Sequence, residues 1–243
     1  MIKNNTWTAN VLTLFPEMFP GSLSYSLTGK ALKNDLWNLK TYDLRKFANG
    51  KRKTVDGPSA GGGAGQILKA DVLDKAIGHI IESNSNYDRN SWPIVALSPR
   101  GRVFSQTEAL HFSKCKGITF ICGRYEGIDE RFLKFHNIPE LSLGDFILSG
   151  GELAAQVLID SVVRLIPGVL GNYKSLEEES FVNYLLEYPQ YTSPKEWKNL
   201  CIPEELLSGH HQKIKNWRLN KSEEITKKRR PDLWERHKSS RNH

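Results

Sequence analysis

Ile118-Thr-Phe-Ile-Cys-Gly-Arg-Tyr-Glu-Gly-Ile-Asp129 is an apolar run that ends in a glycine-bearing turn. The same pattern occurs in Ile94-Val-Ala-Leu-Ser-Pro-Arg-Gly101 and in Leu141-Ser-Leu-Gly-Asp-Phe-Ile-Leu-Ser-Gly-Gly-Glu152. Short β-branched runs that are followed by glycine and then by helical sequence are typical of buried parallel strands, whose C-terminal loops line a ligand crevice. The three motifs therefore predict an α/β fold with a mostly parallel sheet, in which three loops form one site.

The sequence around these motifs continues the alternation of strands and helices. The spacing of apolar residues predicts strands over 10–15 and 37–42 and a helix over 22–36. A long polar, glycine-rich loop is expected over 45–66, and a helix over 70–82. Such alternation is typical of an α/β domain. The last of these helices is predicted to bury one face, formed by Val72, Leu73, Ala76, Ile77 and Ile80.

The composition is that of an ordinary globular protein, with 39% hydrophobic and 25% charged residues in a chain of 243. The sequence has no apolar stretch of about 18 residues and no secretory pattern at its N-terminus. We therefore expect no contact with membranes and a cytoplasmic location. The three cysteines show none of the close spacings of a zinc site or a redox pair, so no metal site is predicted.

The net charge of +7 lies in the C-terminal tail. Residues 1–210 carry 23 Lys and Arg against 23 Asp and Glu, whereas residues 211–243 carry 11 against 4. A basic end beside a neutral body predicts contact with a polyanion, and nucleic acid is the partner that best fits. A charged helix that is merely solvated is the alternative.

The predicted helix over 152–164 has a polar residue at every fourth position, namely Glu152, Gln156, Asp160 and Arg164. Apart from Ser161, its other residues are apolar. Such a helix is expected to expose this narrow stripe and to bury its other sides in a core or a subunit interface. Asp160 and Arg164 either form an ordinary ion pair or face a site with Arg164 as its charged tip.

The loops of the three motifs suit a neutral base and a cationic or zwitterionic ligand. They hold main-chain donors and acceptors, no cluster of fixed positive charge beyond Arg124, and a set of aromatic and acidic side chains, Tyr125, Phe146, Glu126 and Asp145. The glycine run at 61–65 lacks the residues of a triphosphate site and the spacing of a dinucleotide site. It either lets backbone approach a ligand or is a mobile surface loop. An adenosine-plus-amino-acid cofactor fits the loops.

Six motifs follow one another along the chain: Phe15-Pro-Glu-Met-Phe19, Leu97-Ser-Pro-Arg-Gly101, Cys122-Gly-Arg-Tyr-Glu-Gly-Ile-Asp-Glu-Arg131, the stretch from Leu141 to Leu153, Asp160-Ser-Val-Val-Arg-Leu-Ile-Pro-Gly-Val-Leu-Gly171 and Arg229-Arg-Pro-Asp-Leu233. In this order they closely resemble the TrmD family of bacterial tRNA (guanine-37-N1)-methyltransferases, in the SPOUT superfamily. The resemblance spans nearly the whole chain. It implies a trefoil-knotted domain over 1–168, an interdomain linker over 169–185, a small, mainly helical, basic domain that binds tRNA over 186–243, and a homodimer.

The resemblance implies that S-adenosylmethionine binds in the three loops. Main chain at Leu143, Gly144, Phe146 and Leu148 would hold the adenine edge, and the glycine pair that follows would close over the cofactor. The implied cofactor residues are Leu97, Ser98, Pro99, Gly101, Gly123, Arg124, Tyr125, Glu126, Gly127, Ser142, Leu143, Gly144, Phe146, Leu148, Gly150 and Gly151.

The reaction implied by the resemblance needs a base and a cation. Guanine N1 holds its proton at neutral pH, so a base must remove it, and negative charge then develops on O6, where a cation stabilises it. The resemblance assigns the cation to Arg164 and the base to Glu179, where the family has an aspartate. Glutamate keeps the carboxylate on an arm that is one methylene longer. Glu178 is the fallback base, and an acidic linker that is only solvated is the alternative.

The resemblance also identifies a segment that would contact tRNA. Residues 208–218 match the segment that binds tRNA in the family, where basic side chains would contact phosphates and Trp217 is either a stacking residue or a core residue.

The sequence departs from the family at two places. Residues 57–60 do not match the family pattern, and Arg100 replaces a residue that is commonly glutamine. The resemblance also implies Mg²⁺ for activity. Methylation of a ribose 2′-oxygen, and RNA binding without catalysis, are the alternative functions.

Overall fold

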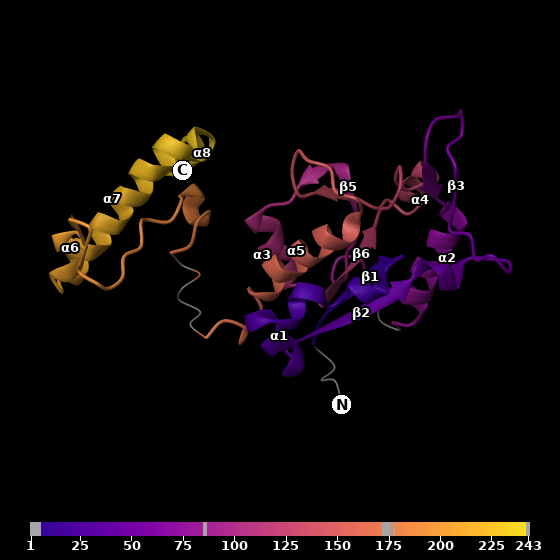
Figure 1. Ribbon diagram of the computed structural model, residues 1–243, viewed down its shortest axis with the longest axis horizontal. Coiled ribbons are helices and arrows are strands. Elements are labelled where there is room, and N and C mark those ends of the chain that lie inside the picture. Colours follow the sequence, from indigo (N-terminus) through magenta and orange to yellow (C-terminus); the bar gives the residue numbers. More distant parts are fainter. Residues whose placement is uncertain (1–5, 85–86, 172–175, 177, 242–243) are drawn as a thin grey trace. The chain divides into compact units, whose positions relative to one another are not determined.

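The computed structural model describes residues 6–84, 87–171, 176 and 178–241, and it divides into two compact units (Figure 1). The N-terminal unit comprises residues 1–171 and the C-terminal unit comprises residues 172–243. Of the linker predicted over 169–185, residues 172–175 and 177 lie outside the described part. The division into a knotted domain, a linker and a tRNA-binding domain stays a prediction.

A five-stranded parallel sheet forms the centre of the N-terminal unit, in the order β2-β1-β6-β5-β7. Its strands are β1 (Trp7–Thr13), β2 (Trp37–Asp43), β5 (Ile94–Val103), β6 (Gly117–Cys122) and β7 (Glu140–Ser142). The register pairs Leu97 with both Cys122 and Leu141. The three motif strands are therefore neighbours whose ends meet at one edge, as the sequence predicted.

Helices cover both faces of this sheet, which a parallel sheet requires. On one face α2 (Ala70–Glu82) and α4 (Glu130–Phe135) pack against side chains such as Leu12 and Ile121. On the other face α5 (Gly151–Val163) packs on β1, β5 and β6, beside α3 (Gln106–Ser113) and α1 (Ser26–Lys33) (Figure 1). The predicted core face of α2 is confirmed: Val72, Leu73, Ala76, Ile77 and Ile80 are all buried.

The helix predicted over 22–36 is shorter than expected. It is divided into a 3₁₀ turn, η2 (Gly21–Ser24), and α1, which begins at Ser26. Tyr25 is extended and Ser26 has a φ of 54°, so the chain bends between the two segments. Gly29 packs so closely on the backbone of Ser24 that no side chain would fit there. Spacing of apolar residues alone does not reveal such a bend.

The loop predicted over 45–66 contains regular structure that the sequence analysis missed. A 3₁₀ turn, η3 (Leu44–Phe47), begins it, and β3 (Asp56–Pro58) pairs with β4 (Gln66–Leu68) in an antiparallel hairpin. Backbone hydrogen bonds tie β4 to the loop after β6, from Leu68 N to Gly127 O (2.9 Å) and from Asp129 N to Leu68 O (3.1 Å). The prediction of a loop was therefore wrong over 45–47, over 56–58 and at Gln66, where β4 begins.

The C-terminal unit is mainly helical, as predicted. It contains η5 (Val182–Tyr184), a hairpin of β8 (Glu196–Trp197) and β9 (Leu200–Cys201), α6 (Glu204–Leu207), α7 (His211–Arg229) and α8 (Pro231–Arg241). Its interior is small and partly polar, with Leu233, Thr226 and His237 buried. Among the described residues, no helix combines the length and the apolar character that crossing a membrane would need.

Candidate active site

A cavity of about 1000 Å³ opens where the loops after β5, β6 and β7 meet. All of the predicted cofactor residues line it except Gly101 and Gly144. The β3–β4 hairpin contributes Gly57, Pro58, Ser59 and Ala60 to the same wall. Pockets for small molecules are typically about 300 to 1000 Å³ and mostly apolar, so this cavity has the size of a cofactor site.

The two predicted residues that do not line the cavity have structural roles. Gly101 lies in β5 against the backbone of Glu140 and Leu141, where an added Cβ would overlap main-chain atoms. Gly144 has a φ of 150°, and a Cβ at this position would lie against the ring of Phe146. Both glycines are needed for the path of the chain.

Aromatic side chains of the loops are unusually exposed around the cavity. Tyr125 and Phe146 are 55% and 54% exposed, and both line the cavity wall. Tyr125 also has a φ of 57°, a left-handed conformation that is uncommon for a bulky side chain. Strained residues gather at ligand sites, where the surrounding structure holds them in place. Exposed apolar surface of this kind is consistent with a ligand that covers it.

A buried ion pair joins the loops that form the cavity. Arg124 Nε donates to Glu152 Oε2 (2.9 Å), Arg124 Nη1 donates to Ser149 O (3.1 Å), and Thr13 Oγ1 donates to Glu152 Oε1 (2.7 Å). The guanidinium also lies over the ring of Phe15, 4.3 Å from its centroid. The side chain of Glu152 is 1% exposed and that of Arg124 18%. This network connects β1, the loop after β6 and the loop after β7.

The glycine pair at the start of α5 is needed for this network. A Cβ on Gly150 would overlap Arg124 Nε, and a Cβ on Gly151 would lie 2.8 Å from the Cα of Cys122. Only glycine therefore lets α5 begin directly against β6 and beneath the guanidinium. Cys122 is buried at this point, and burial raises the pKa of its thiol.

Removing Glu152 is expected to destabilise the fold strongly. In Glu152→Ala the Arg124 guanidinium loses its partner in a largely buried place, which typically costs about 3 to 5 kcal/mol. Urea unfolding at a fixed protein concentration measures this loss. Arg100→Gln is the control, because it removes an exposed ion pair to Glu130 and Glu140 and should leave the free energy of unfolding nearly unchanged. A loss for Glu152→Ala no larger than that of the control would contradict the proposed importance of the network.

The orientation of α5 differs from the prediction. Glu152 and Gln156 are buried, whereas Leu153 and Val157 are 54% and 50% exposed. The buried amide of Gln156 is satisfied, since its Nε2 donates to Met18 O (3.1 Å) and its Oε1 accepts from Ser22 Oγ (2.9 Å). Hydrogen bonds of this kind offset the cost of burying polar groups. The exposed stripe of α5 therefore includes an apolar part that the sequence analysis assigned to a core or a subunit interface.

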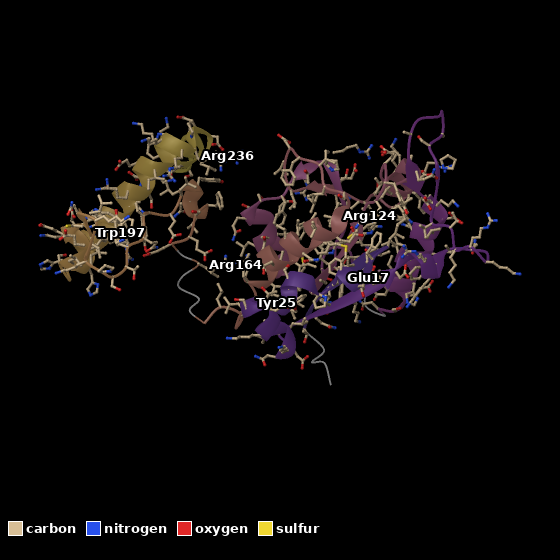
Figure 2. The ribbon with its side chains drawn as sticks, in the orientation of Figure 1. Glu17, Tyr25, Arg124, Arg164, Trp197 and Arg236 are labelled. Atoms are coloured by element: carbon tan, nitrogen blue, oxygen red, sulfur yellow. The ribbon has the colours of Figure 1, made fainter. Side chains whose placement is uncertain are left out.

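Arg164 and Arg124, which lines the cavity, lie toward opposite ends of α5 (Figure 2). Gly150 and Gly151 line the cavity at the start of the helix, and Arg164 follows its last residue. Thirteen helical residues separate these ends by about 20 Å. This separation exceeds the reach of an arginine side chain. Within one chain, the structure does not bring Arg164 to the cavity.

Glu178 and Glu179, the two candidate bases, both lie in the C-terminal unit. Glu178 Oε2 accepts hydrogen bonds from Tyr188 OH (2.6 Å) and Arg218 Nη1 (2.9 Å). The Arg218 guanidinium also lies over the Tyr188 ring, 4.8 Å from its centroid. The carboxylate of Glu178 thus belongs to a structural cluster. Glu179 is bound to the following turn through its backbone oxygen, which accepts from Val182 N (3.3 Å).

Trp217, in the segment predicted to contact tRNA, is half-buried. Its ring packs edge-on against Tyr191, with 6.1 Å between the centroids. This contact favours the interpretation of Trp217 as a core residue of the C-terminal unit. The neighbouring Lys213 and Lys215 on α7 are exposed.

A charged cluster at the cavity rim was not predicted. Arg100 Nη2 contacts Glu130 (2.9 Å) and Glu140 (3.1 Å), and so connects the first loop to α4 and β7. Glu130 and then Glu140 raise the pKa of Arg100, and Arg100 in turn lowers the pKa of Glu130. The feature of the sequence that could have indicated this cluster is Arg100, which stands where the family commonly has a neutral glutamine.

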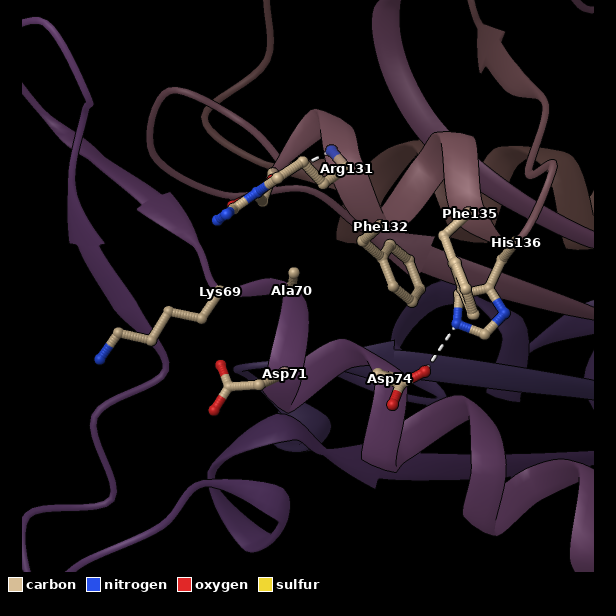
Figure 3. Close-up of a pocket in the computed structure, with 9 residues that line it drawn as sticks. Lys69, Ala70, Asp71, Asp74, Arg131, Phe132, Phe135 and His136 are labelled. Carbon is tan, nitrogen blue, oxygen red and sulfur yellow. Dashed lines mark hydrogen bonds and ion pairs between the residues drawn. The ribbon is translucent and has the colours of Figure 1, made fainter.

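A second cavity of about 540 Å³ lies between α2 and α4 (Figure 3). It is lined by Lys69, Ala70, Asp71, Asp74, Asp129, Arg131, Phe132, Phe135 and His136. A contact of 2.7 Å between His136 Nε2 and Asp74 Oδ1 closes one side. None of the predicted site residues lines this cavity, so we assign the candidate active site to the larger one. Among the described residues, no group of three or more His, Cys, Asp or Glu could hold a metal ion.

A parallel sheet with a cavity at the carboxyl ends of three neighbouring strands defines an α/β protein of the class that binds nucleotide-like ligands at such edges. Comparison with known proteins identifies the family within this class. The family model described as tRNA (Guanine-1)-methyltransferase TrmD matches residues 8–236. The chain belongs to this family.

Curated relatives agree with the family model. The tRNA (guanine-N(1)-)-methyltransferase of Ruegeria sp. (strain TM1040) is 58% identical over 228 residues, which cover 94% of this chain and 92% of the relative. The enzymes of the same name from Ruegeria pomeroyi and Pelagibacter ubique are each 54% identical. Their matches cover 98% and 96% of this chain, and 96% and 100% of the relatives.

Proposed function

We propose that this protein transfers a methyl group from S-adenosylmethionine to N1 of guanine-37 in tRNA. The observation that carries the proposal is the cavity at the ends of β5, β6 and β7, whose walls include all but two of the residues that the family resemblance assigns to the cofactor. Family membership supplies the reaction class.

The residues of the cavity fit this cofactor. Leu141, Leu143 and Phe146 offer apolar surface for an adenine ring, and the carboxylate of Glu126 suits a cationic group. Main-chain groups of the loop over 142–151 suit the hydrogen-bonding edge of adenine. When bound, S-adenosylmethionine supplies an electrophilic methyl group on a positively charged sulfur.

The protein must then supply a base and charge stabilisation. Glu179 would take the proton from guanine N1, which leaves an electron pair on N1 for the methyl group that the cofactor would supply. The carboxylate would gain one proton while the cofactor would lose its positive charge, so charge would be balanced. Arg164 stabilises the negative charge that develops on O6. Glu178, whose carboxylate accepts hydrogen bonds from Tyr188 and Arg218, is the fallback candidate for the base.

A homodimer would complete this site. Arg164 lies ten residues, about 15 Å, beyond Ala154, the last residue of α5 that lines the cavity, so the two can act on one guanine if each comes from a different subunit. The exposed Leu153 and Val157 on α5, with Leu110 on the adjoining α3, offer an apolar surface for a second copy. Apolar patches on one face are typical of subunit interfaces.

The C-terminal unit is proposed to hold the tRNA. Its segment 186–243 includes the basic helix α7, whose exposed Lys213 and Lys215 suit phosphates. Mg²⁺ is proposed to support activity, and the cytoplasm is proposed as the location.

A labelled-methyl assay tests the function. Purified protein, labelled S-adenosylmethionine, Mg²⁺ and unmodified tRNA with guanine at position 37 should yield labelled N1-methylguanine, and tRNA with adenine at that position should not. Label in a 2′-O-methylated nucleotide would indicate the ribose reaction instead. Transfer no faster than without protein, together with intact tRNA binding, would indicate an RNA-binding protein. Chelation by EDTA should lower the rate if Mg²⁺ takes part.

A further inference from the structure

The chain that follows Glu179 forms a turn with an unusual backbone. Phe181, Asn183 and Tyr184 have φ values of 80°, 50° and 60°, and none of them is glycine. Left-handed conformations of this kind are rare for aromatic residues and cost about 1 to 3 kcal/mol each. Three of them in four residues persist only where surrounding contacts hold the turn. The turn over 181–184 therefore needs anchors.

His237 of α8 is the first anchor. Its ring is 4% exposed, and Nδ1 lies 2.7 Å from the backbone oxygen of Asn183. A carbonyl oxygen only accepts, so Nδ1 carries the proton and donates it. Trp234, one turn earlier on α8, stacks on the imidazole with 5.5 Å between the ring centroids. The ring is thereby fixed in the orientation that holds the turn.

Thr226 of α7 is the second anchor. It is fully buried, and its Oγ1 accepts a hydrogen bond from Leu186 N (2.8 Å), just after the turn. Leu185 and Leu233 are buried beside it. The helices α7 and α8 thus hold the same short segment.

The anchored turn is connected directly to Glu179. Val182 N donates to Glu179 O (3.3 Å), and Phe181 N donates to Leu185 O (2.6 Å). On the other side of Glu179, Glu178 is bound to Tyr188 and Arg218. The backbone of Glu179 therefore lies between two segments that α7 and α8 hold in place.

We infer that His237 is a positioning residue for methyl transfer, because it anchors the strained turn that sets the backbone of Glu179. This inference rests on the proposed role of Glu179 as the base. Small displacements of a catalytic group can lower a rate by about 10²-fold, so a single hydrogen bond to Asn183 can matter for turnover. The helices proposed to bind tRNA would in this way also determine where the carboxylate lies.

The test replaces His237 with Phe, which keeps the stacking on Trp234 but lacks the donor, and with Asn, which keeps a donor near the position of Nδ1. His237→Phe is expected to lower the single-turnover rate constant at least about tenfold, with the Kd for tRNA and the KM for S-adenosylmethionine within about twofold of wild type. His237→Asn should retain most of the rate. Ser239→Ala on the exposed side of α8 is the control and should behave as wild type.

Three results would overturn the inference. They are an unchanged rate in folded His237→Phe, a rate loss accompanied by an equal loss of tRNA affinity, and no recovery in His237→Asn. If His237→Phe does not fold, Thr226→Val removes the second anchor and should give the same pattern.

Hydrogen exchange separates this inference from the proposed base. Amides over 181–185 should exchange faster in His237→Phe than in wild type, whatever residue acts as the base. A fully active Glu179→Gln would overturn the base assignment, and with it the positioning role, while faster exchange would still establish the anchor. An inactive Glu179→Gln beside a fully active His237→Phe would overturn the inference alone.

Discussion

Glu179→Gln should lower the rate of methyl transfer to tRNA by about 10² to 10⁴-fold, the usual contribution of a general base. Glutamine keeps the size and the polar character of the side chain but cannot accept the proton of guanine N1. The single-turnover rate with saturating tRNA and labelled S-adenosylmethionine measures the effect. The Kd for tRNA should change little, because the substitution leaves the basic surface of α7 intact.

Two further variants make this result specific. Glu179→Asp should keep most of the activity, since the carboxylate remains and its arm shortens by one methylene. Glu178→Gln should lose little, because the amide oxygen of glutamine can still accept hydrogen bonds from Tyr188 and Arg218 and so hold this segment in place. An active Glu179→Gln combined with an inactive Glu178→Gln would instead assign the base to Glu178.

Structural features could be predicted from the sequence where a local pattern of residues determines them. The apolar face of α2 was predicted residue by residue, because a helix of period 3.6 packed on a sheet must bury one side. The three glycine-bearing motifs likewise predicted neighbouring parallel strands and a shared cavity, since carboxyl ends of parallel strands meet at one edge.

The parts that could not be predicted depend on contacts between distant segments. Nothing local to Gln66–Leu68 indicates that this strand binds the loop at Gly127 and Asp129. The polar stripe of α5 was assigned to the surface because polarity usually means exposure, but Glu152 and Gln156 are buried and hydrogen bonded to Thr13, Arg124 and Ser22. A pattern of polarity does not distinguish a solvated residue from a buried one that is hydrogen bonded.

Arg164→Ala is expected to lower the rate of methyl transfer by about 10² to 10³-fold, as the loss of one group that stabilises a developing oxyanion does. Binding of S-adenosylmethionine, measured by calorimetry, should stay within about twofold of wild type, because Arg164 is assigned to guanine O6 and not to the cofactor. Arg164→Lys should keep part of the rate, since a positive charge remains. Normal turnover in Arg164→Ala would exclude the assigned role.

Mixed dimers test whether the site is shared between subunits, as the position of Arg164 at the C-terminal end of α5 suggests. Arg164→Ala keeps an intact cavity, whereas Gly150→Val places a side chain against Arg124 and spoils the cavity. If each site combines the cavity of one subunit with Arg164 of the other, equal mixing of the two inactive variants gives half mixed dimers, each with one complete site. The mixture should then recover about a quarter of the wild-type rate. No recovery in mixtures that have exchanged subunits would mean that each chain completes its own site, and that the C-terminal end of α5 reaches the guanine by another route.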